Sequence, residues 1–253
     1  MKKANAFLFL AALAFLAIVP AGAFAADIDA EGSPAVFAGH AYYDLTTGAM
    51  SWETNPAPLA AVDIYSNTAS ATAFAISSTD LAATWGDEVT TTGPGTLDQV
   101  DFTIFNSGSS AGPLSSATFT INLFDGPSST FLGGFNTSVT FTGSGLPAGF
   151  FSIITVTGIS GLGINLPGTD VIITQKVASK TGAASRLGIA GLAPVTIGAG
   201  SPAMFINAST IGPAGFYTLT GIPSADPGYR LAVLESVPTN TKTWGSVKGM
   251  YRK

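Results

Sequence analysis

Apolar and polar residues alternate along much of the chain with the two-residue period of β-strands. In the segment 100–105 the apolar Val100, Phe102 and Ile104 share one side, and the segment 117–124 repeats the pattern. Successive side chains of a strand point to opposite faces, so each segment predicts a strand with one buried face. No window of the sequence shows a sustained helical period.

Other segments of the same type are separated by residues that favour turns. Further strands are predicted at 36–43, 61–66, 89–92, 139–141, 151–157, 171–177, 216–220 and 229–234. Gly, Pro and Asn bound them. The segment 85–88 is predicted to form a turn, and the Gly- and Ala-rich segment 182–203 a loop across one end. About nine or ten antiparallel strands without helices predict an all-β fold, a single jelly-roll-like β-sandwich.

The N-terminus has the pattern of an export signal. Lys2 and Lys3 precede an uncharged apolar run from Ala6 to Val19, and Ala23-Phe24-Ala25 offers small residues to a signal peptidase. The alternative is an uncleaved anchor, but the run is shorter than the ~20 residues that a membrane-spanning helix needs. Cleavage after Ala25 is therefore predicted, with no transmembrane helix in the mature chain.

The last residues have a different pattern from the rest. Trp244, Val247 and Tyr251 recur at helical spacing, with Lys248 and Arg252 beside them. This predicts a short basic amphipathic tail for sorting or docking, and the alternative is a solvated end without structure. The predicted organisation is a signal peptide at 1–25, a β-sandwich domain at 26–236, and a polar linker and tail at 237–253.

Composition supports an exported β protein and narrows its partners. The chain has 17 Phe, 30 Gly, 15 Pro and no Cys, so the fold forms without disulfides. Without its first 25 residues it keeps 8 Lys and Arg against 15 Asp and Glu, a formal charge of −7, and no basic residue occurs between Lys3 and Lys176. Phosphate binding needs clustered basic residues, so a nucleic-acid partner is not expected.

Catalytic or metal-binding signals are sparse. The segment 108–112 spells Gly-x-Ser-x-Gly, but it joins two predicted strands and the single histidine, His40, precedes it, so a loop is favoured over a nucleophile elbow. One His and no Cys predict no catalytic residue set and no metal ligands. Close carboxylates such as Asp98 and Asp101 leave a glycoside hydrolase as the least favoured alternative. Structural calcium stays open, without assigned ligands.

Aromatic residues are the remaining candidates for ligand binding. Sandwich modules hold sugars by stacking aromatic rings on pyranose faces. Trp52 and Trp85 are the predicted carbohydrate-binding residues, with Tyr42, Tyr43 and Tyr65 as further candidates. The alternative is that these rings belong to the core.

Five central segments carry a resemblance to known proteins: 61–68, 85–89, 102–108, 121–125 and 215–218. They resemble secreted β-sandwich proteins of environmental bacteria, many of which end in a PEP-CTERM sorting tail and are exosortase substrates. The resemblance covers about residues 60–235 and implies export without catalytic residues. The tail departs from this pattern, because Val237-Pro238-Thr239 lacks the Glu-Pro and only Arg252-Lys253 matches the basic end.

The sequence as a whole predicts a secreted, non-enzymatic structural or adhesive protein of the bacterial cell surface or extracellular matrix. A carbohydrate-binding module is the alternative. The expected partners are extracellular polysaccharide or other surface proteins, and no cofactor is expected.

Overall fold

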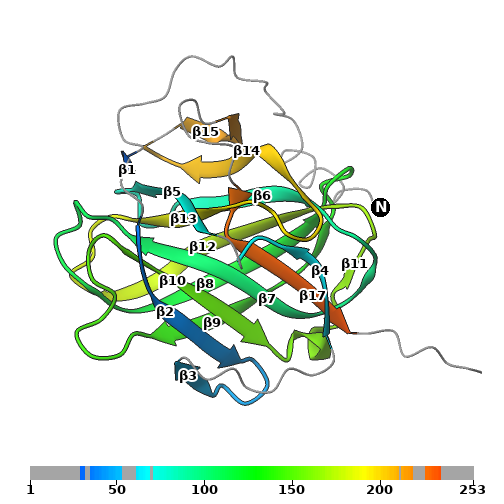
Figure 1. Cartoon of the computed structure of the whole chain (residues 1–253), viewed down its shortest axis with the longest axis horizontal. Helices are drawn as coiled ribbons and strands as arrows, with labels where there is room; N and C mark the ends of the chain where they lie inside the picture. Colours follow the sequence, from blue (N-terminus) through cyan, green and yellow to red (C-terminus); the bar gives the residue numbers. More distant parts are fainter. Residues whose placement is uncertain are drawn as a thin grey trace, which may run out of the picture.

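The computed structural model describes residues 29–31, 35–52, 61–68, 71–210, 212–218 and 226–234, which form two packed β-sheets (Figure 1). Sheet A contains, in spatial order, β1 (Asp29–Glu31), β5 (Ala71–Ser78), β13 (Leu187–Ala193), β7 (Gly95–Asn106), β10 (Phe150–Thr157), β2 (Val36–Asp44) and β3 (Met50–Trp52). Attached to it are β4 (Ala61–Ser66), β11 (Asn165–Leu166), β16 (Asp226–Pro227) and β17 (Tyr229–Leu234). Sheet B contains β15 (Gly212–Thr218), β14 (Ala199–Ala208), β6 (Thr84–Thr90), β12 (Asp170–Gly182), β8 (Leu114–Asp125) and β9 (Phe131–Thr140).

Eight of these strands are nested in pairs. β5 pairs with β13, β6 with β12, β7 with β10, and β8 with β9, and all four pairs are antiparallel. The first of the eight strands therefore pairs with the last, the second with the seventh, and so on inward, while the chain crosses repeatedly between the sheets. This is the arrangement of a jelly roll. The predicted all-β sandwich is confirmed.

Sheet A forks along β7. The C-terminal end of β7 pairs with β13 at Phe105 and Asn106, whereas the segment from Phe102 to Leu97 pairs with β17. Between the two branches, Gln175 of sheet B donates from Nε2 to the backbone carbonyl of Thr103 at 2.7 Å. The fork therefore leaves backbone of sheet A accessible to polar side chains of sheet B.

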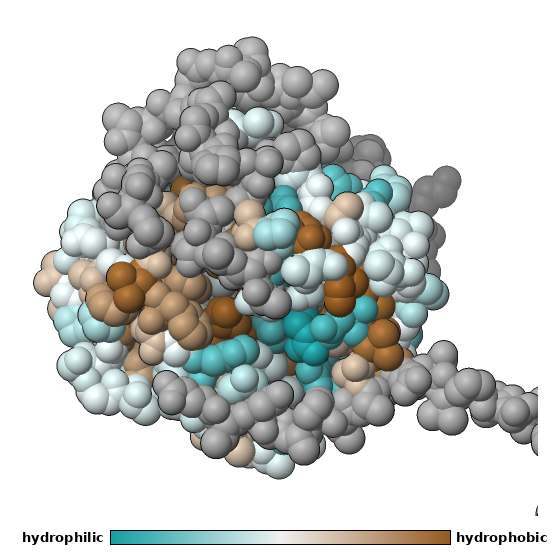
Figure 2. All heavy atoms as spheres, viewed as in Figure 1, coloured by the Kyte–Doolittle hydropathy of each residue, from teal (hydrophilic) through white to brown (hydrophobic). Residues whose placement is uncertain are grey.

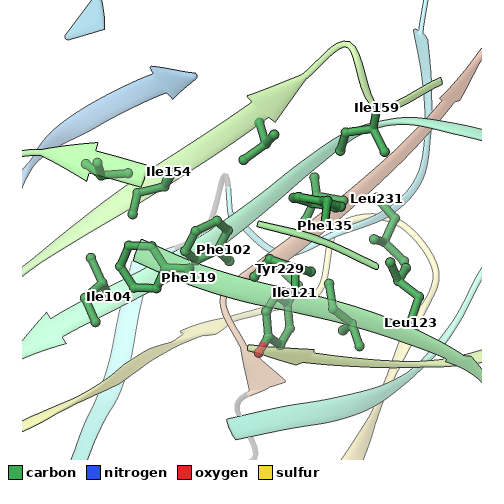
Figure 3. Packing of buried hydrophobic residues seen from close by; sticks show 14 of the residues in the cluster. Phe102, Ile104, Phe119, Ile121, Leu123, Phe135, Ile154, Ile159, Tyr229 and Leu231 are labelled. Carbon is green, nitrogen blue, oxygen red and sulfur yellow. The ribbon is translucent and has the colours of Figure 1, made fainter. Parts of the chain in front are cut away.

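The core fills the space between the sheets. Phe102 and Ile104 of β7 face Phe119 and Ile121 of β8, and all four are 0–1 % exposed (Figure 3). The rings of Phe102 and Phe119 meet edge-on, with centroids 5.0 Å apart. Each such side chain contributes roughly 1.5–3 kcal/mol by burial. The apolar residues that alternate along these two strands in the sequence are therefore the ones that point into the core.

Two predictions for irregular segments are wrong. Residues 85–88 lie within β6 rather than in a turn. The segment 182–203 contains β13 and the beginning of β14 rather than a loop. Its small residues serve close packing, because a Cβ on Gly188 would clash with the Ile76 carbonyl and a Cβ on Gly191 with the Phe74 ring of β5.

Helices are almost absent from the described residues. The described residues contain one, the short 3-10 helix η1 (Ile159–Leu162). Within that part of the chain, no helix is long and apolar enough to cross a membrane. The predicted signal peptide, 1–25, and the predicted tail, 237–253, lie outside the described residues.

Candidate functional site: an aromatic groove at the edge of the sandwich

A groove of about 480 Å³ opens where β2 and β3 of sheet A meet the connection from β9 to β10. Four aromatic rings dominate its walls, and the other lining residues are small, apolar or hydroxyl-bearing. The lining residues are Phe37, Ala38, Trp52, Phe141, Thr142, Gly145, Leu146, Pro147, Phe150 and Ser152. None of them carries a charged side chain, so the groove offers rings and hydroxyls to a ligand.

Trp52 is held between the edge strands of the two sheets. It ends β3, where it pairs with Ala41 of β2. Its indole Nε1 donates to the carbonyl of Thr140 in β9 at 3.2 Å, and its ring lies against Phe141 with centroids 5.6 Å apart and planes 48° apart. The ring is therefore fixed on one side while it stays half-buried at the groove wall.

A bulge in β2 shapes the opposite wall. Phe37 pairs with Phe151 of β10, but the next residue of β10, Ser152, pairs with Gly39, so Ala38 is an extra residue in β2. Bulges re-aim side chains and are frequent beside functional sites. Here Phe37 packs against Phe151, with centroids 5.3 Å apart, and remains 52 % exposed.

Ser152 supplies a buried polar group to this groove. The residue is 0 % exposed and lines the groove, and its Oγ has no hydrogen-bond partner. An unpaired buried hydroxyl costs about 1–3 kcal/mol. A ligand hydroxyl that reached Ser152 would therefore recover a hydrogen bond that the protein alone does not make.

The structure separates the two predicted sugar-binding tryptophans. Trp52 lines the groove, but Trp85 is 4 % exposed and packs between the sheets with Met204 and Ile206. Trp85 occupies an inward position of β6, which favours the alternative for this residue, a ring of the core. Tyr65 is also fully buried, while Tyr42 and Tyr43 are half-buried outside the groove lining.

His40 belongs to a row of hydrogen bonds on the outer face of sheet A. Thr155 donates to Oδ1 of Asp101 at 2.8 Å, so the His40 Nε2 that lies 2.7 Å from the Thr155 hydroxyl must be the donor of that bond. His40 Nδ1 then accepts from the Tyr42 hydroxyl at 3.2 Å. Burial lowers the pKa of His40, Arg230 adds to the effect, and Asp101 opposes it.

Arg230 extends this row onto β17 and β4. Its guanidinium forms ion pairs with Asp63 at 2.7 Å and with Asp101 at 3.4 Å. Burial raises the pKa of Asp101, while Arg230 and the Thr155 hydroxyl act in the opposite direction. Figure 2 shows hydrophilic side chains gathered on this face over β7, β10 and β17. The single histidine therefore lies in a continuous hydrogen-bonded row on the outer face of sheet A.

The other candidate features of the sequence are the Gly-x-Ser-x-Gly segment, the close carboxylates and the C-terminal tail. The Gly-x-Ser-x-Gly segment 108–112 forms part of the connection between β7 and β8 and precedes no helix. Among the residues with described positions, no group of three or more His, Asp or Glu side chains comes together. The tail residues Trp244, Val247, Lys248, Tyr251 and Arg252 lie outside the described part of the chain.

No protein-family model matches the sequence, and no curated protein matches it significantly.

Proposed function

We propose that this chain is an exported, non-enzymatic adhesive protein of the cell surface or extracellular matrix, and that it adheres by holding a sugar in the aromatic groove. The observation that carries the proposal is the groove itself, with four aromatic rings around a buried hydroxyl that has no partner. Ligand sites are typically apolar pockets with a few placed polar groups. Pyranose rings have this dual character, with apolar C–H faces and hydroxyls at the rim.

The chemistry of the lining favours binding over catalysis. Its side chains are Phe, Trp, Ala, Leu, Pro, Thr and Ser, with glycine, and none of them is a general acid or base near neutral pH. The same composition favours a neutral sugar. A uronic acid or sulfated sugar would meet no cation in the groove and a chain of net negative charge around it.

Export and surface attachment rest on sequence patterns. The predicted signal peptide, the absence of cysteine and the resemblance to secreted bacterial sandwich proteins support a location outside the cytoplasm. Rows of Thr, Ser and Asn on the outer face of sheet B also suit an extracellular surface. In one such row Thr118 bonds to Ser138 at 3.0 Å, and Thr120 to Asn136 at 2.7 Å.

The test is a glycan array followed by titration of the bound sugar with the mature protein and two variants. Trp52→Ala removes one ring from the groove, and a loss of about two- to tenfold in affinity is expected from the aromatic contact alone, because such contacts contribute ~0.5–1.5 kcal/mol beyond buried area. Phe131→Ala is the matched control. It removes a 58 % exposed ring at the far end of β9, roughly 30 Å from Phe141 by strand rise, and should bind normally.

Two results would contradict the proposal. One is a protein that binds nothing on a broad array of neutral and charged glycans. The other is equal binding by the wild type, Trp52→Ala and Phe131→Ala. Near-ultraviolet circular dichroism of Trp52→Ala separates loss of the ring from loss of the fold.

A further inference from the structure

A second polar site lies in the interior, beneath the fork of sheet A. Asp87 of β6 is 0 % exposed; its Oδ1 accepts from the Glu88 backbone amide at 2.9 Å, and its Oδ2 has no hydrogen-bond partner. The Tyr65 hydroxyl of β4 is also buried without a partner. Buried polar atoms are nearly always hydrogen-bonded in folded proteins, so two such atoms require an explanation.

The start of β14 brings Tyr65 close to a second carboxylate, that of Asp226. A Cβ on Gly198 would lie 3.1 Å from Cδ2 of Tyr65. Two positions later, a Cβ on Gly200 would overlap the Asp226 carboxylate. The tyrosine ring and the carboxylate therefore pack directly on glycine backbone at neighbouring positions, where any larger residue would displace them.

The pairing of β14 with β6 places Asp87 at the same end. Gly200 pairs with Val89 and Met204 with Asp87, so the intervening residues 201–203 bulge out of register beside Asp87. On the neighbouring strand β12, Ile173 is opposite Asp87, and Gln175 is its diagonal neighbour. The Gln175 Oε1 is a third buried oxygen without a partner.

The electrostatics of these groups agree with their proximity. Burial raises the pKa of Asp87 well above its ordinary value, and the charge of Asp226 raises it further. Burial also raises the pKa of Asp226. For Tyr65, burial raises the pKa most, and both carboxylates add to the effect.

We propose that Asp87, Asp226 and Tyr65 form a calcium site that links sheet B to the fork of sheet A. Calcium takes six to eight oxygen ligands from carboxylates, side-chain amides, backbone carbonyls and water. The two carboxylates supply charge, and the Tyr65 hydroxyl and Gln175 Oε1 supply neutral oxygens. Asp226 is partly exposed and gives an ion access from solvent.

The number of carboxylate ligands largely determines how tightly a site binds calcium. Two carboxylates form a weaker site than the acidic loops of cytosolic calcium sensors. The expected dissociation constant is therefore in the range of about 10⁻⁴–10⁻³ M that is typical of extracellular modules.

The experiment is thermal unfolding of the EDTA-treated mature protein during titration with calcium chloride. Calcium at tenfold its dissociation constant should raise the Tm by about 3–6 °C for a domain of this size. Asp87→Asn and Asp226→Asn should each abolish the rise. Glu88→Gln is the matched control, because it removes a carboxylate one residue away, on the opposite face of β6, and should respond as the wild type does.

Terbium provides a readout besides stability. Terbium bound at the calcium site should be sensitised by the aromatic rings near Asp87, among them Trp85 and Tyr229, and Asp226→Asn should remove the emission while Glu88→Gln keeps it. The proposal is overturned if about 10 mM calcium leaves the wild-type Tm unchanged, or if both Asn variants respond like the wild type. If Asp87→Asn does not fold, the partly exposed Asp226→Asn decides the question alone. Sugar binding at the groove is not involved in either measurement.

Discussion

The substitution Asp87→Asn should change how stability depends on pH in calcium-free buffer. The folded protein holds a proton on Asp87 that the unfolded chain releases above a pKa of about 3.9, because burial raises the pKa in the fold. Stability from this group is present at low pH and is lost as pH rises toward the folded pKa. The loss is about 1.4 kcal/mol per pH unit. Asparagine keeps the shape and does not titrate.

The measurement compares urea unfolding of the wild type and Asp87→Asn at pH 4.5 and 5.5 in EDTA. Asp101 and Asp226 also have raised pKa values, but they titrate in both proteins, so the difference between the proteins isolates Asp87 to first order. Asp87→Asn should gain up to about 1.2 kcal/mol relative to the wild type over this interval, or about 2–5 °C in Tm. Equal stability changes in the two proteins between pH 4.5 and 5.5 would refute the reasoning, because Asp87 would then be ionised in the fold.

Two further predictions concern the core and the outer face of sheet A. Phe102→Ala should cost about 3–5 kcal/mol in chemical unfolding, because the ring is fully buried against Phe119. Phe131→Ala, at an exposed ring, should stay within about 0.5 kcal/mol. His40 has a lowered pKa in the fold, so at this residue the unfolded chain binds more protons, and the contribution of His40 to stability should rise with pH up to about 6.5. His40→Gln should flatten this rise, and an NMR titration of the imidazole should show the lowered pKa directly.

The strands that could be predicted are those with large side chains on one face. The segments 61–66 and 229–234 coincide with β4 and β17, since large apolar residues alternate there between clear breakers. Strand β13, by contrast, could not be predicted from the sequence. Its sequence Leu-Gly-Ile-Ala-Gly-Leu-Ala has too few bulky residues to show a period, and its small residues are selected by the close approach of β5. That contact joins residues more than a hundred positions apart and leaves no local signal.

Only some residues of the groove and of the interior polar site could be predicted from the sequence, for the same reason. Trp52 was a candidate from its chemistry alone, but Phe37 and Ser152 become a site only when β2 lies parallel to β10, a pairing that no turn connects. Asp87 carried a turn-like local signal, because Trp-Gly-Asp-Glu favours a turn unless a partner strand lies on each side. Its burial depends on β12 and β14, which occur much later in the chain.

The proposed calcium site lies where the last strands of the described chain attach to sheet A. Strands β16 and β17 come last in the described chain. β16 pairs with β13 in one branch of the fork, whereas β17 forms the other branch with β7 and β4, so β17 depends on contacts with residues far earlier. A chain without cysteine cannot fix such an attachment with a disulfide. An ion held by Asp87 and Asp226 would close a loop of 139 residues (226 less 87). Clips that close long loops remove the most entropy from the unfolded state. Calcium bound there would therefore stabilise the late strands more than the nested jelly-roll pairs, and hydrogen exchange in β17 should slow on calcium addition while that in β8 and β9 changes less.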